Sequence, residues 1–72
     1  MPPLPVISGR ACVTALAKLG YIAIRQKGSH VRLSCGGRTA VTVPLHDELD
    51  RGTLRAILRE IGLSVQDFIA LL

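Results

Sequence analysis

Gly28 and Ser29 separate two short segments in which apolar and polar side chains alternate. Such alternation is typical of β-strands, and a two-residue break that contains glycine is typical of a tight hairpin turn. A two-residue loop aligns four pairs across the hairpin: Lys27 with His30, Gln26 with Val31, Arg25 with Arg32, and Ile24 with Leu33. This register predicts a hairpin with cations and a histidine on one face and aliphatic side chains on the other, whereas a one-residue slip would invert one strand.

Helical periodicity flanks the hairpin on both sides. Ser8 is a good N-cap for a helix that ends at about Leu19, before Gly20. Asp50 can cap a second helix over about residues 51–61, which stops at Gly62. The expected buried faces consist of Cys12, Ala15, Leu16 and Leu19 in the first helix, and Leu54, Ile57, Leu58 and Ile61 in the second.

The remaining segments predict a third strand and a short terminal helix. The turn at residues 35–38 leads into a strand over 39–43, with Val41 and Val43 facing the core and Pro44 ending it. At the end of the chain, Ser64 caps a short helix and Asp67 completes a capping-box-like pair with it. Leu63 can pack on Phe68 as a hydrophobic staple.

Together these elements predict an α+β fold in the order α-β-β-β-α. Its three-stranded antiparallel sheet carries helices on one face and leaves the other face free. We expect one domain over residues 1–72, with residues 1–7 as an extended lead-in. A chain of this length buries only about 60% of its unfolded surface, and the hydrophobic content of 49% can supply a dense core.

The start of the chain and its apolar runs bear on location. Pro2, Pro3 and Pro5 interrupt the N-terminus before the apolar run of a signal peptide can form. No stretch approaches the length that spans a bilayer. We therefore expect a cytoplasmic protein without a membrane partner.

The charges of the chain are unevenly distributed around a net charge of +4. Between residues 10 and 45 every charged side chain is basic: Arg10, Lys18, Arg25, Lys27, Arg32 and Arg38. The acidic residues all follow, at Asp47, Glu48, Asp50, Glu60 and Asp67. This pattern favours a polyanionic partner for the N-terminal half, although a basic protein without such a partner can share it.

The cysteines and acidic residues give no sign of a metal site or cofactor. Cys12 and Cys35 are isolated, which implies neither a zinc site nor a disulfide framework. No cluster of carboxylates falls on the basic face, where catalytic magnesium would need one. Phosphate-binding loops of the P-loop type are also missing, so we expect no cofactor and no metal.

His30 is the candidate catalytic residue. Histidine is the side chain best suited to move a proton near neutral pH. The cations Arg25, Lys27 and Arg32 on the same face would repel one another unless an anion lies between them, which favours a phosphate site. Gly28 permits close approach of a ligand, and Ser29 offers a hydroxyl and a turn N–H to a phosphate. The alternative is a surface histidine on a solvated strand face.

His46 is a possible second acid or base. It follows Pro44 and precedes Asp47 and Glu48. A histidine in such a place more often anchors a loop or a helix end through a hydrogen bond. Both interpretations stay open from the sequence.

Four stretches of the chain closely resemble the HicA family: RQKGSH at residues 25–30, VPLH at 43–46, GTLRAIL at 52–58 and GLS at 62–64. HicA proteins are toxins of bacterial and archaeal toxin–antitoxin pairs. The resemblance implies a fold like that of the double-stranded-RNA-binding domain and a metal-independent ribonuclease that acts on mRNA. It also implies that His30 is the active histidine and that a HicB antitoxin masks the toxin.

Three hypotheses for the function follow. In the first, the protein is an endoribonuclease: His30 is the general base on a ribose 2′-OH, and Arg25, Lys27 and Arg32 hold the phosphate. The acid for the leaving oxygen is then Lys27, His46 or water. In the second, the same face binds RNA without cleaving it. In the third, the basic face binds an acidic protein partner.

Overall fold

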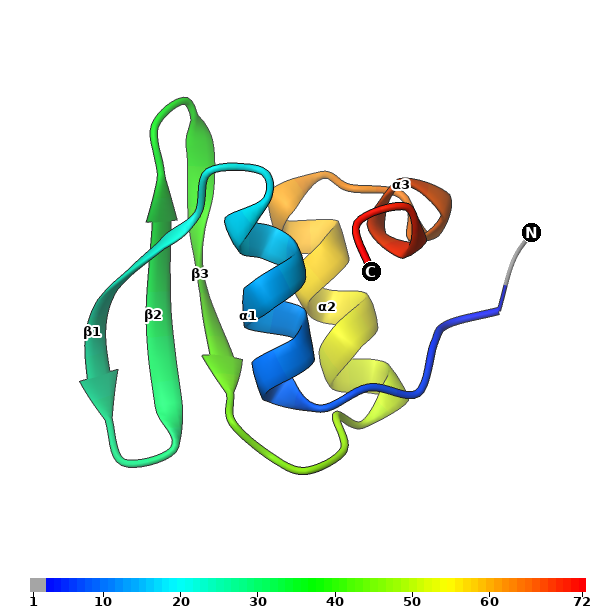
Figure 1. The fold of residues 1–72 in the computed structure, drawn as a ribbon, viewed down its shortest axis with the longest axis horizontal. Coiled ribbons are helices and arrows are strands. Elements are labelled where there is room, and N and C mark those ends of the chain that lie inside the picture. The colour runs from blue at the N-terminus through cyan, green and yellow to red at the C-terminus, as the bar shows by residue number, and fades with distance from the viewer. Residues whose placement is uncertain (1–2) are drawn as a thin grey trace.

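The computed structural model describes residues 3–72, which form a helix, three strands and two further helices (Figure 1). The elements are α1 (Gly9–Ala17), β1 (Ile22–Lys27), β2 (His30–Cys35), β3 (Arg38–Pro44), α2 (Arg51–Ile61) and α3 (Val65–Ile69). The strands form one antiparallel sheet in the order β1-β2-β3. The predicted α+β fold in the order α-β-β-β-α is therefore confirmed.

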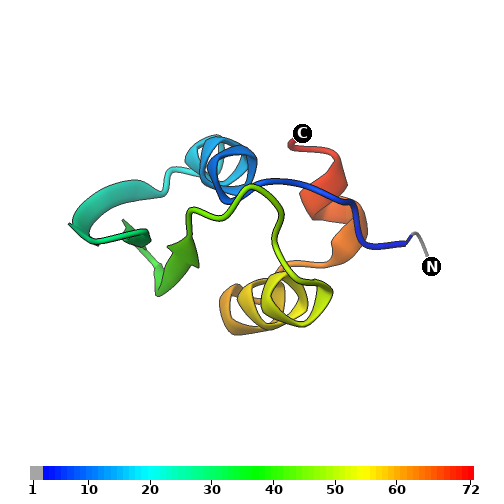
Figure 2. The same ribbon diagram turned by 90° about the horizontal axis from the view of Figure 1, so that it is seen from below.

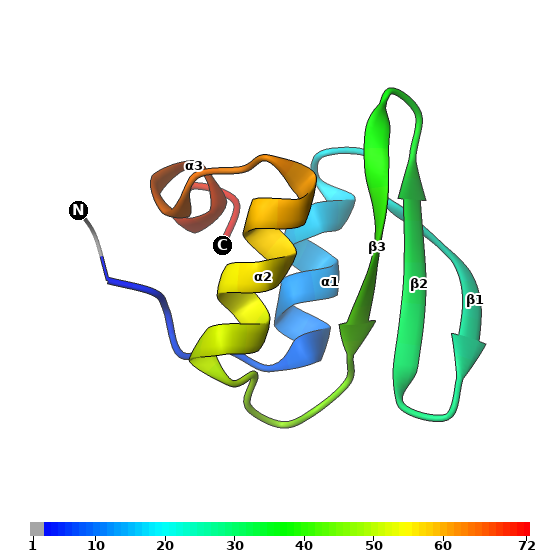
Figure 3. The same ribbon diagram turned by 180° about the vertical axis from the view of Figure 1, so that it is seen from behind.

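The helices lie on one side of the sheet, as the end-on view of Figure 2 shows. Both α1 and α2 pack on β3, and β1 forms the edge far from α2 (Figures 1 and 3). The core lies between these layers; its largest fully buried side chains are Phe68, Leu16, Leu33, Leu54, Val41, Val43 and Cys12. This packing leaves the outer face of the sheet uncovered.

Helix α1 begins as predicted and ends slightly earlier. The Ser8 side chain accepts a 3.0 Å hydrogen bond from the Ala11 backbone N–H, which confirms the cap. The helix was predicted to reach about Leu19, but its regular part ends at Ala17. Beyond that point the N–H groups of Leu19 and Gly20 donate to carbonyls three residues back. The last turn is therefore tighter than an α-helix.

Strand β1 contains an irregularity that the alternation did not predict. Ala23 pairs with Leu33, and the register shifts between Ala23 and Arg25, so the predicted pairing of Ile24 with Leu33 is wrong. The expectation that Ile24 lies on a buried aliphatic face is also wrong, because its side chain is 56% exposed, and that of Ile22 is 64% exposed. A bulge of this kind is common at sheet edges, where a strand has one partner only.

Beyond the irregularity the predicted register holds. Arg25 pairs with Arg32, Gln26 with Val31, and Lys27 with His30. On β2 and β3 the aliphatic side chains Val31, Leu33, Val41 and Val43 are buried, as predicted. The third strand extends one residue further at each end than expected, over Arg38–Pro44.

Helix α2 has the predicted bounds and buried stripe, but its N-terminal cap differs from the prediction. Leu54, Ile57, Leu58 and Ile61 are buried, and Gly62 ends the helix with a left-handed φ of 71°. Asp50 precedes the helix, yet its side chain makes no cap hydrogen bond. The Asp50 carbonyl instead accepts from the Leu54 N–H at 2.9 Å.

The two ends of the chain pack around this framework. Ser64 caps α3 by accepting a 3.0 Å hydrogen bond from the Asp67 N–H, as predicted, and Phe68 is fully buried. Residues 3–7 form neither helix nor strand, and the Leu49 N–H donates to the Ile7 carbonyl at 2.8 Å. The first two residues of the expected lead-in lie outside the described residues.

Each helix within residues 3–72 is too short or too polar to cross a bilayer.

Candidate functional site

A hollow of about 380 Å³ lies on the outer face of the sheet. Its lining consists of Arg25, Lys27, His30, Arg32 and Thr42. The sequence predicted that the first four share a face, and the structure brings them together. None of the lining residues is acidic, so the hollow is a concave surface of positive charge that is suited to an anion.

The strand register explains how these side chains meet. Lys27 lies opposite His30 and Arg25 lies opposite Arg32, each pair across the β1–β2 ladder. Because side chains two residues apart on a strand share a face, all four project from the side opposite the buried Val31. The irregularity at residue 24 falls beyond these pairs and leaves their common face intact.

Thr42 is the lining residue that the sequence analysis missed. It pairs with Arg32 across the β2–β3 ladder, and its Oγ1 accepts a 3.0 Å hydrogen bond from Arg32 Nη1. The signal was present in the sequence, since Thr42 lies between the core residues Val41 and Val43 and so faces outward. Its contact with Arg32 holds one guanidinium nitrogen in place at the hollow.

The turn that joins β1 and β2 lies beside the hollow without lining it. Gly28 has a φ of 60°, in the left-handed region where glycine is favoured, and the Gln26 Nε2 donates to its carbonyl at 3.0 Å. The Ser29 carbonyl accepts a 2.6 Å hydrogen bond from the Leu45 N–H. Gly28, predicted to permit close approach of a ligand, and Ser29, predicted to donate to a phosphate, adjoin the site, and the turn is tied to the segment that follows β3.

His46 lies next to His30. The centroids of the two imidazole rings are 6.3 Å apart, and the ring planes form an angle of 79°. The His46 carbonyl accepts a 2.9 Å hydrogen bond from the Gly9 N–H, at the start of α1. The backbone of His46 thus anchors a loop, its ring lies beside the candidate catalytic residue, and the role of that ring stays a prediction.

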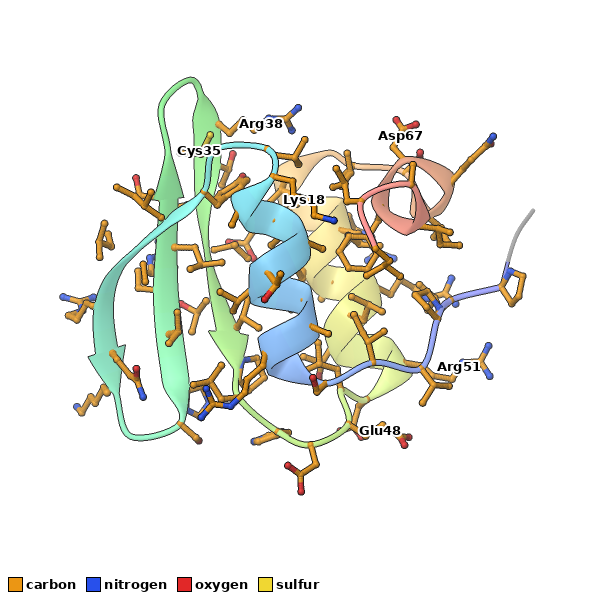
Figure 4. All side chains as sticks on the ribbon, in the orientation of Figure 1. Lys18, Cys35, Arg38, Glu48, Arg51 and Asp67 are labelled. Carbon is orange, nitrogen blue, oxygen red and sulfur yellow. The ribbon has the colours of Figure 1, made fainter. Side chains whose placement is uncertain are left out.

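The other cations of the basic segment, Arg10, Lys18 and Arg38, do not line the hollow. Figure 4 shows Lys18 just after α1 and Arg38 at the β2–β3 turn, at the end of the sheet away from the β1–β2 turn. Glu48 lies in the connection between β3 and α2, at the same end of the molecule as the β1–β2 turn. The positive charge at the hollow therefore comes from Arg25, Lys27 and Arg32.

The cysteines take no part in this site. Cys12 is fully buried, and burial raises the pKa of its thiol to about 11. Cys35 is half-buried, and both are free thiols. Within residues 3–72 no three side chains of His, Cys, Asp or Glu gather as metal ligands would. The hollow itself is lined by one imidazole, three cations and one hydroxyl.

Comparison with known proteins adds a family assignment to this geometry. A family model described as the HicA toxin of bacterial toxin–antitoxin systems matches residues 9–63. The matched segment runs from the first residue of α1 to just past α2, so it includes the whole hollow and His46. A search of curated proteins found no match.

Proposed function

The chain belongs to the HicA family of toxins from bacterial toxin–antitoxin systems, and we propose that it is an endoribonuclease that cleaves mRNA without a metal ion. The observation that carries this proposal is the hollow that gathers His30 with Arg25, Lys27 and Arg32 on one uncovered face. A phosphodiester between these groups has both a base and a source of positive charge beside it. Because mRNA is the substrate, we place the toxin in the cytoplasm.

In the proposed reaction His30 removes the proton from a ribose 2′-OH. The 2′-oxygen then attacks the adjacent phosphorus, and the bond from phosphorus to the 5′-oxygen breaks. The products are a 2′,3′-cyclic phosphate and a 5′-OH. Arg25, Lys27 and Arg32 hold the phosphate and offset the negative charge that develops on it, which is the largest contribution in many enzymes of this kind.

The turn beside the hollow adds uncharged hydrogen-bond donors for the phosphate to the three cations. Ser29 has a hydroxyl and a backbone N–H, both of which are common donors to phosphate oxygens. Gly28 has no side chain, and a Cβ built there would meet nothing within 4 Å, so the space above the turn is open. RNA can approach the turn closely at this point.

An antitoxin partner follows from the family, and we propose that a HicB protein silences the toxin by covering this face. His30, Arg25 and Lys27 are exposed and Arg32 is half-buried, so a partner that covers them blocks both RNA binding and catalysis. Acidic side chains on the partner would match the charge of the hollow.

The experiment that tests the activity is cleavage of a mixed RNA pool in EDTA by the wild type and by His30→Ala. We expect scission by the wild type, with loss of at least about 100-fold in the variant. The thermal midpoint should stay nearly constant, because His30 is exposed. Lys18→Ala is the matched control, since it removes a cation just after α1, away from the hollow, and should cleave like the wild type.

Four further results would overturn the proposal in whole or in part. Undiminished cleavage by His30→Ala would exclude His30 as the base, and equal cleavage of a fully 2′-deoxy substrate would exclude the attack by the 2′-oxygen. Salt-sensitive RNA binding without scission by either protein would instead make this a non-catalytic RNA-binding module. Tight binding of an acidic protein with no effect on RNA would favour a protein-interaction module.

A further inference from the structure

The two imidazoles lie beside one another, although only His30 lines the hollow. Their centroids are 6.3 Å apart and one ring presents its edge to the other. A direct hydrogen bond, about 2.9 Å between nitrogens, would bring the rings closer than this. Each imidazole is therefore free to contact a different oxygen of one phosphodiester.

Two backbone hydrogen bonds fix the segment that carries His46. The Leu45 N–H donates to the Ser29 carbonyl at 2.6 Å, which ties this segment to the turn just before His30. The Gly9 N–H donates to the His46 carbonyl at 2.9 Å, which ties it to the start of α1. In addition, His30 pairs with Pro44 across the β2–β3 ladder. His46 is therefore held from both sides, although it lies in a loop.

The proposed reaction needs a second proton transfer that His30 cannot supply at the same moment. In phosphoryl transfer the attacking and leaving oxygens lie roughly in line, on opposite sides of phosphorus. A base at the attacking oxygen is therefore displaced from the leaving oxygen, which must gain a proton. A second proton-transfer group close to His30, on the side of the leaving oxygen, is the one suited to give it.

We propose that His46 is this general acid, an assignment that rests on the proposed ribonuclease activity. His30 accepts the proton of the 2′-OH while the bond between O2′ and phosphorus forms. As the bond from phosphorus to O5′ breaks, the His46 imidazolium gives its proton to O5′. The reaction ends with His30 protonated and His46 neutral, and exchange of one proton with water restores both.

The charges around the two histidines differ. Cations line the hollow beside His30. Asp47 and Glu48 follow His46 in the chain, while Arg10 of α1 lies near Leu45, the residue before His46. The charge of Lys27 already holds the phosphate in the proposed reaction, which favours His46 for the acid role.

The test uses an RNA oligonucleotide whose cleavage site for the wild type has been mapped. It is prepared in two forms, with oxygen or with sulfur as the 5′-bridging atom at that bond. A thiolate leaves without a proton, since thiols are far more acidic than alcohols. We expect His46→Ala to slow the oxygen substrate by about 100-fold to 10,000-fold and the sulfur substrate by less than about tenfold.

The controls separate the role of His46 from those of its neighbours. His30→Ala should slow both substrates, because the base is needed with either leaving group. Lys27→Ala should also slow both to the same degree, as a phosphate-binding residue would. His46→Gln, which keeps a hydrogen-bonding side chain, should behave as His46→Ala does, and thermal unfolding shows that each variant is folded.

Each other outcome counts against the assignment in a distinct way. An equal loss on both substrates would make His46 a positioning residue, and no loss on either would exclude it altogether. Rescue of Lys27→Ala or of His30→Ala by sulfur would give the acid role to that residue instead. Absence of wild-type cleavage of any RNA, which would leave no site to map, would end the proposed function together with this assignment, whereas the first three outcomes leave the ribonuclease activity standing.

Discussion

Nη1 of Arg32 donates a 3.0 Å hydrogen bond to Oγ1 of Thr42 across the β2–β3 ladder, at the edge of the cationic hollow. A free arginine side chain loses rotamer entropy when a ligand fixes it. Arg32 has lost part of its rotamer entropy before RNA binds, because Thr42 on the neighbouring strand β3 already holds one nitrogen of its guanidinium. The remaining donors of the guanidinium are left for a phosphate.

We expect Thr42→Val to weaken RNA binding. Valine keeps the shape and the strand preference of threonine but cannot accept the hydrogen bond from Arg32. The dissociation constant should rise by about twofold to tenfold, the value of one ordinary hydrogen bond. The measurement is the affinity for a short single-stranded RNA in the non-cleaving His30→Ala background. Thr39→Val, on the same strand but outside the hollow, should bind as the background does, and an equal effect there would contradict the specific role of Thr42.

The cations of the hollow should determine the salt dependence of binding. Each phosphate that a cation neutralises releases counterions, at a slope of about −0.7 in log K against log salt for single strands. Arg25→Gln and Lys27→Gln should therefore each reduce the magnitude of the slope by about 0.7. Lys18→Gln, just after α1, should leave the slope unchanged. Titrations at several salt concentrations in the His30→Ala background check this, and equal slopes in all variants would show that phosphate lies elsewhere.

Local patterns predicted the part of the site that lies on one hairpin. Alternation gave the common face of Arg25, Lys27, His30 and Arg32, and the two-residue turn gave their register, because both depend on neighbours in the chain. The buried stripe of α2 could also be predicted from the sequence, because helical spacing determines which residues share a face.

What the sequence did not predict depends on contacts between distant segments. The irregularity at Ile24 arises at a sheet edge, where the pairing and twist of the whole sheet decide whether an extra residue fits. The place of His46 beside His30 depends on hydrogen bonds to Ser29 and Gly9 that no local pattern encodes. Asp50 is a favourable residue type for a cap, and nothing in the structure explains why its side chain makes no cap hydrogen bond.

Gly9 should be essential for the loop that carries His46. A Cβ at this position would lie 2.0 Å from the Pro44 carbonyl oxygen and 2.8 Å from the Leu45 Cα, both backbone atoms that cannot swing aside. Gly9→Ala must therefore push α1 away from this segment and weaken the bond to the His46 carbonyl. We expect a loss of roughly 1–3 kcal/mol in the free energy of unfolding, as for overpacking elsewhere, together with slower RNA cleavage.

Gly52→Ala is the matched control for this substitution. Gly52 lies in α2, and a Cβ built there meets nothing within 4 Å. Alanine is favoured over glycine inside helices, so this variant should gain about 0.5–1 kcal/mol and keep its activity. Urea unfolding and RNA cleavage of the two variants check both expectations. Wild-type stability in Gly9→Ala would show that the close approach can be relieved without cost.

Cys12 should make the stability of the fold fall at high pH. Its side chain is fully buried, and burial raises the pKa of the thiol from 9.0 to about 11. Between these values the unfolded chain gives up the thiol proton while the folded chain keeps it. The unfolded state then binds fewer protons, so the free energy of unfolding decreases as pH rises through this window. The total decrease in the free energy of unfolding is about 3 kcal/mol, and there is no decrease well below pH 9.0.

The contribution of Cys12 can be isolated with Cys12→Ala. The variant should be less stable than the wild type at neutral pH, because it loses a buried sulfur atom, but it lacks the thiol titration. Tyr21, whose pKa is also raised by burial, is present in both proteins and cancels in the comparison. The difference in unfolding free energy between the two should therefore shrink from pH 9.0 toward about 11. Urea unfolding across this range measures it, and parallel curves for the two proteins would mean that the Cys12 thiol ionises as readily in the folded chain as in the unfolded one.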